Sequence, residues 1–320
     1  MTCFDAFKNI NIANTQGQLR IGPCCVAPTK FTDTIDFHNN QYLAELRDKW
    51  NNNIWPKECS RCKQAEDQGL VSKRMGSEQW YTDQGLNNNT VELIRLDYWV
   101  GNMCNLACAI CSPASSSTWC QELKLPIVSK KANINKFWQD LDLSSLKLIH
   151  FHGGEPLMSK EHVKMLQAVP FKDQVQVTYN TNATIRVTDE LKDLWSQFQL
   201  VHLDFSIDDI GDRFEYQRYP ANWEDVVSNL NWYLETAPHN VMFGINTTVS
   251  WLNQHSLPDL ENWLKQNFST SRFADPVEHR KQFAHGPLSC SSDLASVKRY
   301  LDLIDQRRGT DWRKTFPELV

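Results

Sequence analysis

The chain has 320 residues, of which 41% are hydrophobic and 22% are charged, and its formal net charge is -5. This length allows one large α/β domain of about 200 to 250 residues beside a smaller one, and the composition lacks the basic excess of a nucleic-acid-binding protein. The N-terminus shows no charged segment followed by an apolar stretch, and no long apolar run occurs, so we expect a cytoplasmic protein without a membrane span.

The ten cysteines are the most informative residues in the composition. Intracellular thiols are kept reduced, so cysteines there bind metals or act in catalysis more often than they form disulfides. Eight of the ten fall in two groups before residue 112, and Cys120 and Cys290 stand alone as small core residues. The grouping therefore predicts two metal sites.

Residues 1–90 form the first predicted domain. Short strands are expected around 21–28 and a helix over 40–50, with cysteine-bearing loops beside them. A small domain of this kind needs a staple such as a metal. Enough thiolates for one closed zinc or iron-sulfur site come from Cys3, Cys59, Cys62 and one of the adjacent pair Cys24 and Cys25.

From residue 91 onward, apolar strand patterns alternate with helical patterns. The helical patterns include 187–198, with Thr188 as the N-cap, and 222–235, with Asn222 as the N-cap. Repeated strand-helix order predicts a parallel sheet. The expected strands lie within 91–100, 146–153, 175–183, 200–208 and 240–250.

A sixth strand is harder to place. Residues 254–295 are weakly periodic, so the strand is either disguised within 280–288 or missing, which would leave the sheet truncated at its sixth unit. An amphipathic helix is expected over 293–308. We therefore predict a second domain over 91–265 and a C-terminal helical extension over 266–320.

Polar and thiol side chains follow the predicted strands at the points where the strands end. The carboxyl ends of parallel strands share one edge of the sheet, and chemistry collects there. We therefore expect these side chains to share one site at that edge. The residues concerned are Cys104, Gly153, Gly154, Glu155, Asn180, Asn182, Ser206, Asp208 and Asn246.

The loop "MCNLACAIC" carries Cys104, Cys108 and Cys111 in a C-x3-C-x2-C pattern. Three thiolates on a four-iron cluster leave one iron without a protein ligand. This loop, placed after a first strand, resembles that of the radical S-adenosylmethionine (radical SAM) superfamily. The resemblance implies a partial (β/α)6-type TIM barrel of α/β class, and a 4Fe-4S cluster whose open iron binds the amino and carboxylate groups of SAM.

Three further segments resemble the same family. "HGGEP" at 152–156 resembles its GGEP motif, "YNTNA" at 179–183 the polar end of its third strand, and 205–230 the fourth-strand region of its peptide-modifying subgroup. Alone, each would be read as a turn or a helix cap. The resemblance implies that Gly153, Gly154 and Glu155 bind the SAM amino group, that Ser206 and Asp208 face the ribose, that Arg218 binds the carboxylate, and that Asn180 and Asn182 complete the cofactor site.

The N-terminal cysteines carry a second resemblance. Residues 3–25 and 55–74 resemble the SPASM or twitch auxiliary-cluster module of radical SAM enzymes, although many of those enzymes carry the module after the barrel. The resemblance implies an auxiliary 4Fe-4S cluster, with structural zinc as the alternative. Its implied ligands are Cys3, Cys24, Cys59 and Cys62, with Cys25 as the alternative to Cys24.

The resemblance implies an enzyme that cleaves SAM reductively to a 5'-deoxyadenosyl radical and abstracts hydrogen from a peptide or protein. The outcome would be oxidation, crosslinking or epimerisation, for example of a ribosomally made peptide precursor. The electron would come from a donor such as flavodoxin or ferredoxin. Two alternatives stay open at this point: a sugar, nucleoside or other small metabolite as substrate, and a non-catalytic zinc-stapled binding protein.

Overall fold

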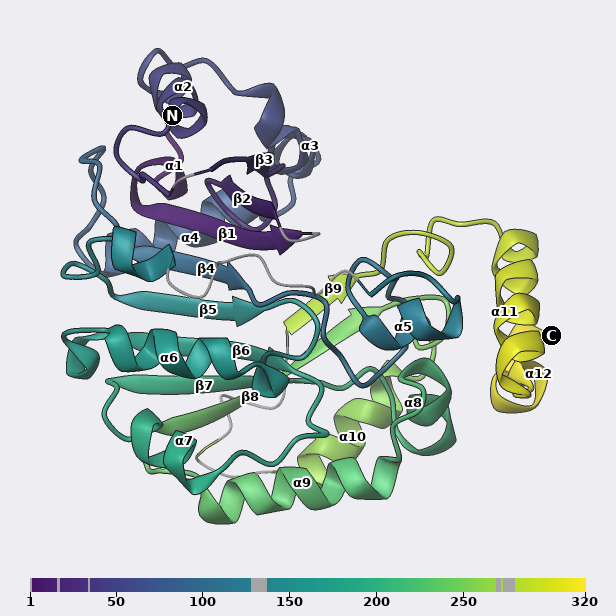
Figure 1. Cartoon of the computed structure of the whole chain (residues 1–320). Helices are drawn as coiled ribbons and strands as arrows, with labels where there is room; N and C mark the ends of the chain where they lie inside the picture. Colours follow the sequence, from purple (N-terminus) through teal and green to yellow (C-terminus); the bar gives the residue numbers. More distant parts are fainter. Residues whose placement is uncertain (1, 16–17, 34, 128–136, 269–271, 273–279) are drawn as a thin grey trace. The chain divides into compact units, whose positions relative to one another are not determined.

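The chain is seen in a computed structural model that describes residues 2–15, 18–33, 35–127, 137–268, 272 and 280–320 (Figure 1). It divides into two compact units. The first comprises Met1–Gly101, Ser129–His152 and Glu161–Val177, and the second comprises Asn102–Val128, Gly153–Lys160 and Thr178–Val320. The domain limits expected at residues 90 and 265 stay predictions.

The first unit is a sheet with helices. Its strands follow the order β3-β2-β1-β4-β5, in which β1 and β2 are antiparallel and β4 runs parallel to both β1 and β5. The centre of β4 is buried, as expected for a parallel strand covered on both faces. The elements are α1 (Asp5–Lys8), β1 (Asn9–Thr15), β2 (Gln18–Gly22), β3 (Lys30–Phe31), α2 (Gln41–Asn51), α3 (Ser60–Asp67), α4 (Lys73–Asp83), β4 (Arg95–Trp99), β5 (Leu148–His152) and α6 (Lys160–Ala168). All residues of α6 except the first, Lys160, belong to this unit.

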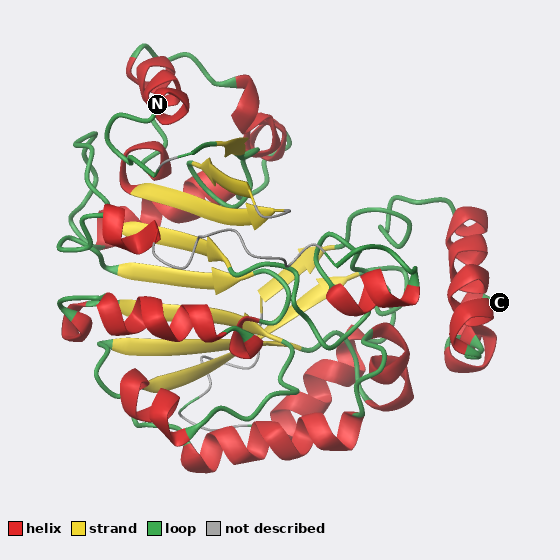
Figure 2. Cartoon of the chain, viewed as in Figure 1, coloured by secondary structure: helices red, strands yellow, loops and turns green. Residues whose placement is uncertain are grey.

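The second unit contains the last four residues of β6 (Gln176–Thr181), followed by alternating helices and strands (Figure 2). β7 and β8 are parallel, and the stacked rings of Phe205 and Phe243, with Tyr233 against Phe205, fill the core beside them. The other elements are α5 (Ser117–Glu122), α7 (Asp189–Trp195), β7 (Leu200–Ser206), α8 (Gly211–Gln217), α9 (Trp223–Thr236), β8 (Val241–Val249), α10 (Leu257–Asn267), β9 (Arg280–Phe283), α11 (Leu294–Arg308) and α12 (Trp312–Thr315).

The predicted helix starts are confirmed by their caps. The side chain of Thr188 accepts a hydrogen bond from the backbone N–H of Leu191 at the start of α7, and that of Asn222 accepts one from Asp225 at the start of α9. Each cap satisfies a backbone donor that the first turn of a helix leaves without an intrahelical partner. The five predicted strands are likewise confirmed as β4 to β8.

A sixth strand is present within 280–288, which confirms the first of the two alternatives and contradicts the second, a sheet truncated at its sixth unit. β9 pairs in parallel with β8, from Asn246 opposite Arg280 to Val249 opposite Phe283. The strand has four residues and lies at the end of the strand order, and Phe283 is 69% exposed. A short strand at the edge of a sheet needs no alternating apolar pattern, which explains why the sequence does not predict it clearly.

Within the described residues, β4 to β9 thus supply six strands in chain order with helices between them. The chain is a mixed α/β protein with parallel strands, as the resemblance to a radical SAM partial barrel implies. In the part of the chain that the structure describes, no helix has both the length and the apolar character needed to cross a membrane.

Candidate functional site

The three-cysteine loop lies in the second unit, directly before α5. The backbone N–H of Cys104 donates to the hydroxyl oxygen of Ser117, 3.1 Å away, and its carbonyl accepts from the hydroxyls of Ser117 and Thr118 at 3.0 and 2.7 Å. Hydroxyl side chains at the start of a helix suit this task because they can both donate and accept. The first turn of α5 therefore fixes the first cysteine.

The three thiols lie in an apolar and crowded setting. Burial raises the pKa of the Cys104 thiol to about 12. Cys111 donates a hydrogen bond to Cys108, which lowers the pKa of Cys108 and raises that of Cys111 well above its ordinary value. Thiolates are the form that binds metal, so a positively charged metal centre would offset the cost of ionising these groups.

Gly153 and Gly154 bring the next loop against the cysteine loop. Gly153 has a φ of 131°, which side-chain-bearing residues rarely adopt. A Cβ on Gly154 would lie 2.2 Å from the carbonyl oxygen of Met103, and the N–H of Glu155 donates to the same oxygen at 2.7 Å. Only glycine fits at position 154, because the two backbones touch.

Glu155 is 1% exposed, and its carboxylate joins its own loop to the end of β6. One oxygen accepts from the Leu157 N–H at 3.1 Å and the Thr181 hydroxyl at 2.8 Å, and the other accepts from the Asn182 N–H at 2.7 Å. Burial raises the pKa of this carboxyl to about 7 in spite of these bonds. A carboxylate offers about four acceptor positions, and these bonds occupy three of them.

Asn182 contacts the cysteine loop itself. Its Nδ2 lies 3.8 Å from the Sγ of Cys104 and donates to the Oδ1 of Asn105 at 3.0 Å. Asn105 in turn donates to the hydroxyl of Thr184 at 2.8 Å. The end of β6 and the first cysteine therefore form one hydrogen-bonded network, and the network includes two of the predicted site residues.

The remaining predicted cofactor residues are placed differently. Asp208 is buried in an ion pair with Arg218, with 2.8 Å between Oδ2 and Nη2, and its other oxygen accepts from the N–H of Thr248. Both side chains thus have partners within the protein. Ser206 lies at the end of β7 opposite Asn246 of β8, and Ser206 and Asn180 are both half-buried. The roles of these residues toward SAM stay predictions.

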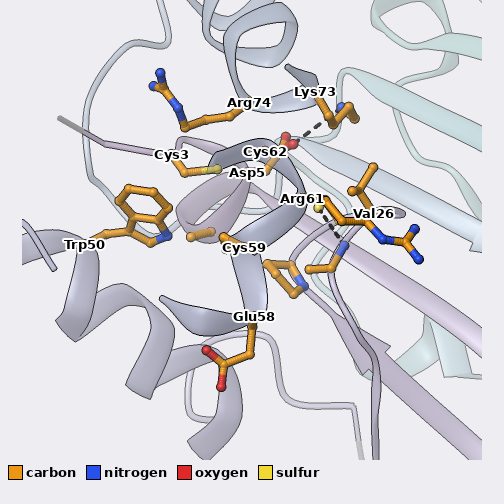
Figure 3. Close-up of a pocket in the computed structure, with 14 residues that line it drawn as sticks. Cys3, Asp5, Val26, Trp50, Glu58, Cys59, Arg61, Cys62, Lys73 and Arg74 are labelled. Carbon is orange, nitrogen blue, oxygen red and sulfur yellow. Dashed lines mark hydrogen bonds and ion pairs between the residues drawn. The ribbon is translucent and has the colours of Figure 1, made fainter. Parts of the chain in front are cut away.

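The first unit brings the N-terminal cysteines to one pocket. Figure 3 shows Cys3, Cys59 and Cys62 around it, and Cys24 lines it as well. Burial raises the pKa values of Cys3 and Cys24 well above the ordinary value, and that of Cys59 to about 12. Cys25 is exposed and is not among the residues that line the pocket.

Charged and polar groups surround these thiols. Lys73 pairs with Asp5 at 3.4 Å, and Arg61 and Arg74 also line the pocket (Figure 3). The indole nitrogen of Trp50, which is buried, has no hydrogen-bond partner among the described residues. A buried donor without a partner is costly, so a ligand that accepts its hydrogen bond would stabilise the pocket.

Within the described ranges, no three His, Cys, Asp or Glu side chains are close enough together to hold a single metal ion.

Several residues at the two sites carry no signal in the sequence. Thr181 and Asn105 are ordinary polar residues until the fold places them beside Glu155 and Asn182. Trp50 belongs to α2, which the sequence predicts as a helix without indicating that this side chain lines a pocket. Pairing between distant segments decides these positions, and local patterns do not report it.

Residues 99–250 match the family model described as the radical SAM superfamily. Solved structures of similar fold include SuiB from Streptococcus suis bound to S-adenosylmethionine, with 12% identity, coverage of 96% of this chain and 70% of that chain, and a TM-score of 0.46. Native anSMEcpe with bound AdoMet has 14% identity, coverage of 68% and 62%, and a TM-score of 0.44. These likenesses are too weak to carry an argument about function. Among the curated proteins, none is similar enough to count as a match.

The close approach at Gly154 predicts that Gly154→Ala disrupts the cysteine loop. The new methyl group would have to displace the Met103 carbonyl, at a cost of about 3 kcal/mol in the free energy of unfolding. Urea unfolding and iron content after reconstitution measure the effect. Gly76→Ala is the matched control, because nothing lies within 4 Å of a Cβ there and alanine should stabilise α4 by about 1 kcal/mol. Equal stability of the two variants would contradict the prediction.

Burial of Glu155 predicts a pH-dependent stability in protein prepared without iron or SAM. The folded state keeps the Glu155 proton up to a pKa of about 7, whereas the unfolded state loses it near 4.5. The free energy of unfolding should therefore fall as pH rises through this window, by up to about 1.4 kcal/mol per pH unit from this group. Glu155→Gln should lack that contribution in urea unfolding at pH 5, 6 and 7. Parallel pH profiles for the two proteins would refute the assignment.

Proposed function

We propose that this chain, which has a radical SAM domain at residues 99–250 and is a radical SAM enzyme, modifies a peptide or protein with the help of an auxiliary iron-sulfur cluster. Its being an enzyme excludes the reading as a non-catalytic zinc-stapled binding protein. The observation that carries the proposal is the gathering of Cys3, Cys24, Cys59 and Cys62 at a second pocket, apart from the radical SAM cysteines.

The family implies a 4Fe-4S cluster and SAM, and the residues present fit both. The loop offers three thiols, which are the ligands that iron-sulfur clusters take. Cys104, Cys108 and Cys111 would hold the cluster, and the remaining acceptor position of Glu155 suits the SAM amino group. When bound, the cluster and SAM supply the one-electron cleavage of SAM and the removal of a substrate hydrogen.

The chain's own residues hold this site rigid. Gly154 allows the GGEP loop to lie directly on the cysteine loop, and Asn182 joins the end of β6 to Cys104. Asp208 and Arg218 fix the loop after β7 through a buried ion pair, which also receives the Thr248 N–H of β8. Such positioning is what a protein contributes when a cofactor carries the chemistry.

The second pocket also fits an iron-sulfur cluster. Four cysteines, Cys24 rather than the exposed Cys25 among them, provide a complete set of thiolates. The indole N–H of Trp50, which has no partner among the described residues, is a donor for a cluster sulfur, and Arg61 adds a positive charge to the lining of the pocket. Hydrogen bonds and charges of this kind set cluster potentials. The bound cluster would accept an electron from the substrate or brace the domain.

A peptide or protein substrate is favoured by two resemblances in the sequence. Residues 205–230, which fold as the end of β7, α8 and the start of α9, resemble the peptide-modifying subgroup, and residues 3–25 with 55–74 resemble the SPASM or twitch module of radical SAM enzymes. The product would be an oxidised, crosslinked or epimerised side chain. A flavodoxin or ferredoxin would supply the electron for SAM cleavage.

Replacing Cys104, Cys108 and Cys111 together with alanine tests the first site. The variant should form no 5'-deoxyadenosine from SAM with dithionite as reductant, because the loop would have no cluster ligand left. Iron at the N-terminal pocket should persist. Chromatographic quantification of 5'-deoxyadenosine and iron analysis measure the two effects, and retained SAM cleavage would overturn the assignment of the loop.

Metal analysis tests the second site. Anaerobically reconstituted protein should contain about eight irons with matching sulfide per chain, the sum of two 4Fe-4S clusters. Cys59→Ala with Cys62→Ala should remove about half of this iron, spare part of the SAM cleavage and abolish turnover of a peptide substrate. About four irons with one zinc would show that the N-terminal pocket is a structural zinc site. That result would contradict the proposed auxiliary cluster.

A further inference from the structure

The turn at residues 107–109, between the first and last cysteines of the loop, is fully enclosed by protein. Ala107, Cys108 and Ala109 are all buried. Buried carbonyl groups need hydrogen-bond donors, since an unsatisfied one costs about 1 to 3 kcal/mol. Within the loop, the N–H of Cys111 donates to the carbonyl of Cys108 at 2.9 Å, and the side-chain donors for the carbonyls of Ala107 and Ala109 come from other parts of the fold.

Three side chains donate to the three consecutive carbonyl oxygens. The indole N–H of Trp119 donates to Cys108 at 2.8 Å. Arg308 donates to Ala107 at 2.7 Å and Tyr300 to Ala109 at 2.8 Å, and both residues belong to α11. Tyr300 is 191 residues distant from Ala109 in the chain, and Arg308 is 201 residues distant from Ala107.

The amide groups of the same turn are held by residues at and just after the end of α8. The N–H of Ala107 donates to the carbonyl of Tyr219 at 2.6 Å, and the N–H of Ala109 donates to that of Gln217 at 2.7 Å. The turn is therefore fixed between the end of α8 and helix α11. Neither contact involves a cysteine side chain, which leaves the thiols available as ligands.

One face of α11 packs against the turn. Val297, Leu301 and Ile304 are buried at helical spacing and share an apolar cluster with Ala107 and Ala109. Residues spaced by three or four positions lie on one face of a helix. Tyr300 and Arg308 follow the same spacing, so the face that buries apolar groups also delivers the two donors.

Arg308 is itself held in place. Its side chain is 2% exposed and pairs with Glu122 of α5, with 3.2 Å between Nη2 and Oε2. The guanidinium lies over the rings of Trp119 and Tyr219, at 4.6 and 4.7 Å from their centres. The planar guanidinium group of arginine can bind a carboxylate and a carbonyl while it stacks on aromatic rings. Lysine cannot make all of these contacts.

We propose that Arg308 and Tyr300 are positioning residues of the SAM-binding cluster, so that the C-terminal helix α11 is part of the cluster site. The inference rests on the proposed function of Cys104, Cys108 and Cys111 as cluster ligands. By holding residues 107–109, the two side chains keep Cys108 and Cys111 at the spacing that the cluster requires. Residues that orient metal ligands in this way typically change metal affinity by about 10- to 100-fold when replaced.

The test compares Arg308→Met, Arg308→Lys and Tyr300→Phe in the full-length, reconstituted protein. The readout is the change that SAM produces in the EPR spectrum of the reduced protein, because only a cluster with an open iron responds to SAM. We expect Arg308→Met to lose this SAM-responsive signal on the order of 10-fold faster than the wild type in the presence of a chelator. Arg308→Lys should be intermediate, and Tyr300→Phe should show a smaller effect in the same direction.

Arg313→Met is the matched control. Arg313 also lies in the C-terminal region, stacks on a tryptophan and pairs with an aspartate, at 4.4 Å from the ring centre of Trp312 and 2.8 Å from Asp302. Among the described residues, its ion pair and ring contact do not involve the cysteine loop, so its variant should keep the wild-type rate. Thermal unfolding of each variant separates loss of the cluster from loss of the fold.

The possible outcomes separate the two claims. A wild-type protein whose EPR spectrum does not respond to SAM refutes the proposed function of the cysteine loop. A responsive wild type together with an Arg308→Met variant that keeps both the signal and its rate of loss refutes the role of α11 alone. Should Arg308→Met unfold, Tyr300→Phe, which removes one hydroxyl, decides the question by the same measurement.

Discussion

The structure around the three-cysteine loop depends on one constraint, which is that the turn at residues 107–109 is buried and its backbone groups must therefore be hydrogen-bonded. The loop from Cys104 to Cys111 has little regular structure, so its peptide groups find partners in other segments. The Met103 carbonyl meets the backbone of Glu155, and the amides of Ala107 and Ala109 meet residues 219 and 217. Because the loop is fixed through its backbone, its three thiols are available as the proposed cluster ligands.

The same constraint explains why Glu155 has two duties. A carboxylate that already accepts from Leu157, Thr181 and Asn182 stays in one orientation, and its pKa is raised to about 7 by burial. A cationic amino group placed beside it would favour the ionised form. The carboxylate of Glu155 can therefore fix its loop and, with its remaining acceptor position, take the proposed role of binding the SAM amino group.

Local patterns in the sequence predicted much of this fold. Alternating apolar residues marked β4 to β8, and Thr188 and Asn222 marked two helix starts, because these features depend on neighbours in the chain. The edge strand β9 was only an alternative, since its partner β8 and not its own composition makes it a strand. The contact of Arg308 with Ala107 could not be predicted from the sequence, because only the fold brings together residues that are 201 positions apart.

The order of synthesis gives the contact between α11 and the cysteine loop a further meaning. A ribosome completes the loop almost 200 residues before it reaches Arg308, so a nascent chain carries the cysteines for most of its synthesis without the donors that enclose their turn. In that interval the thiols are exposed to oxidants and to stray metal ions. We therefore expect the proposed cluster site to be completed only after the C-terminal helix has emerged from the ribosome.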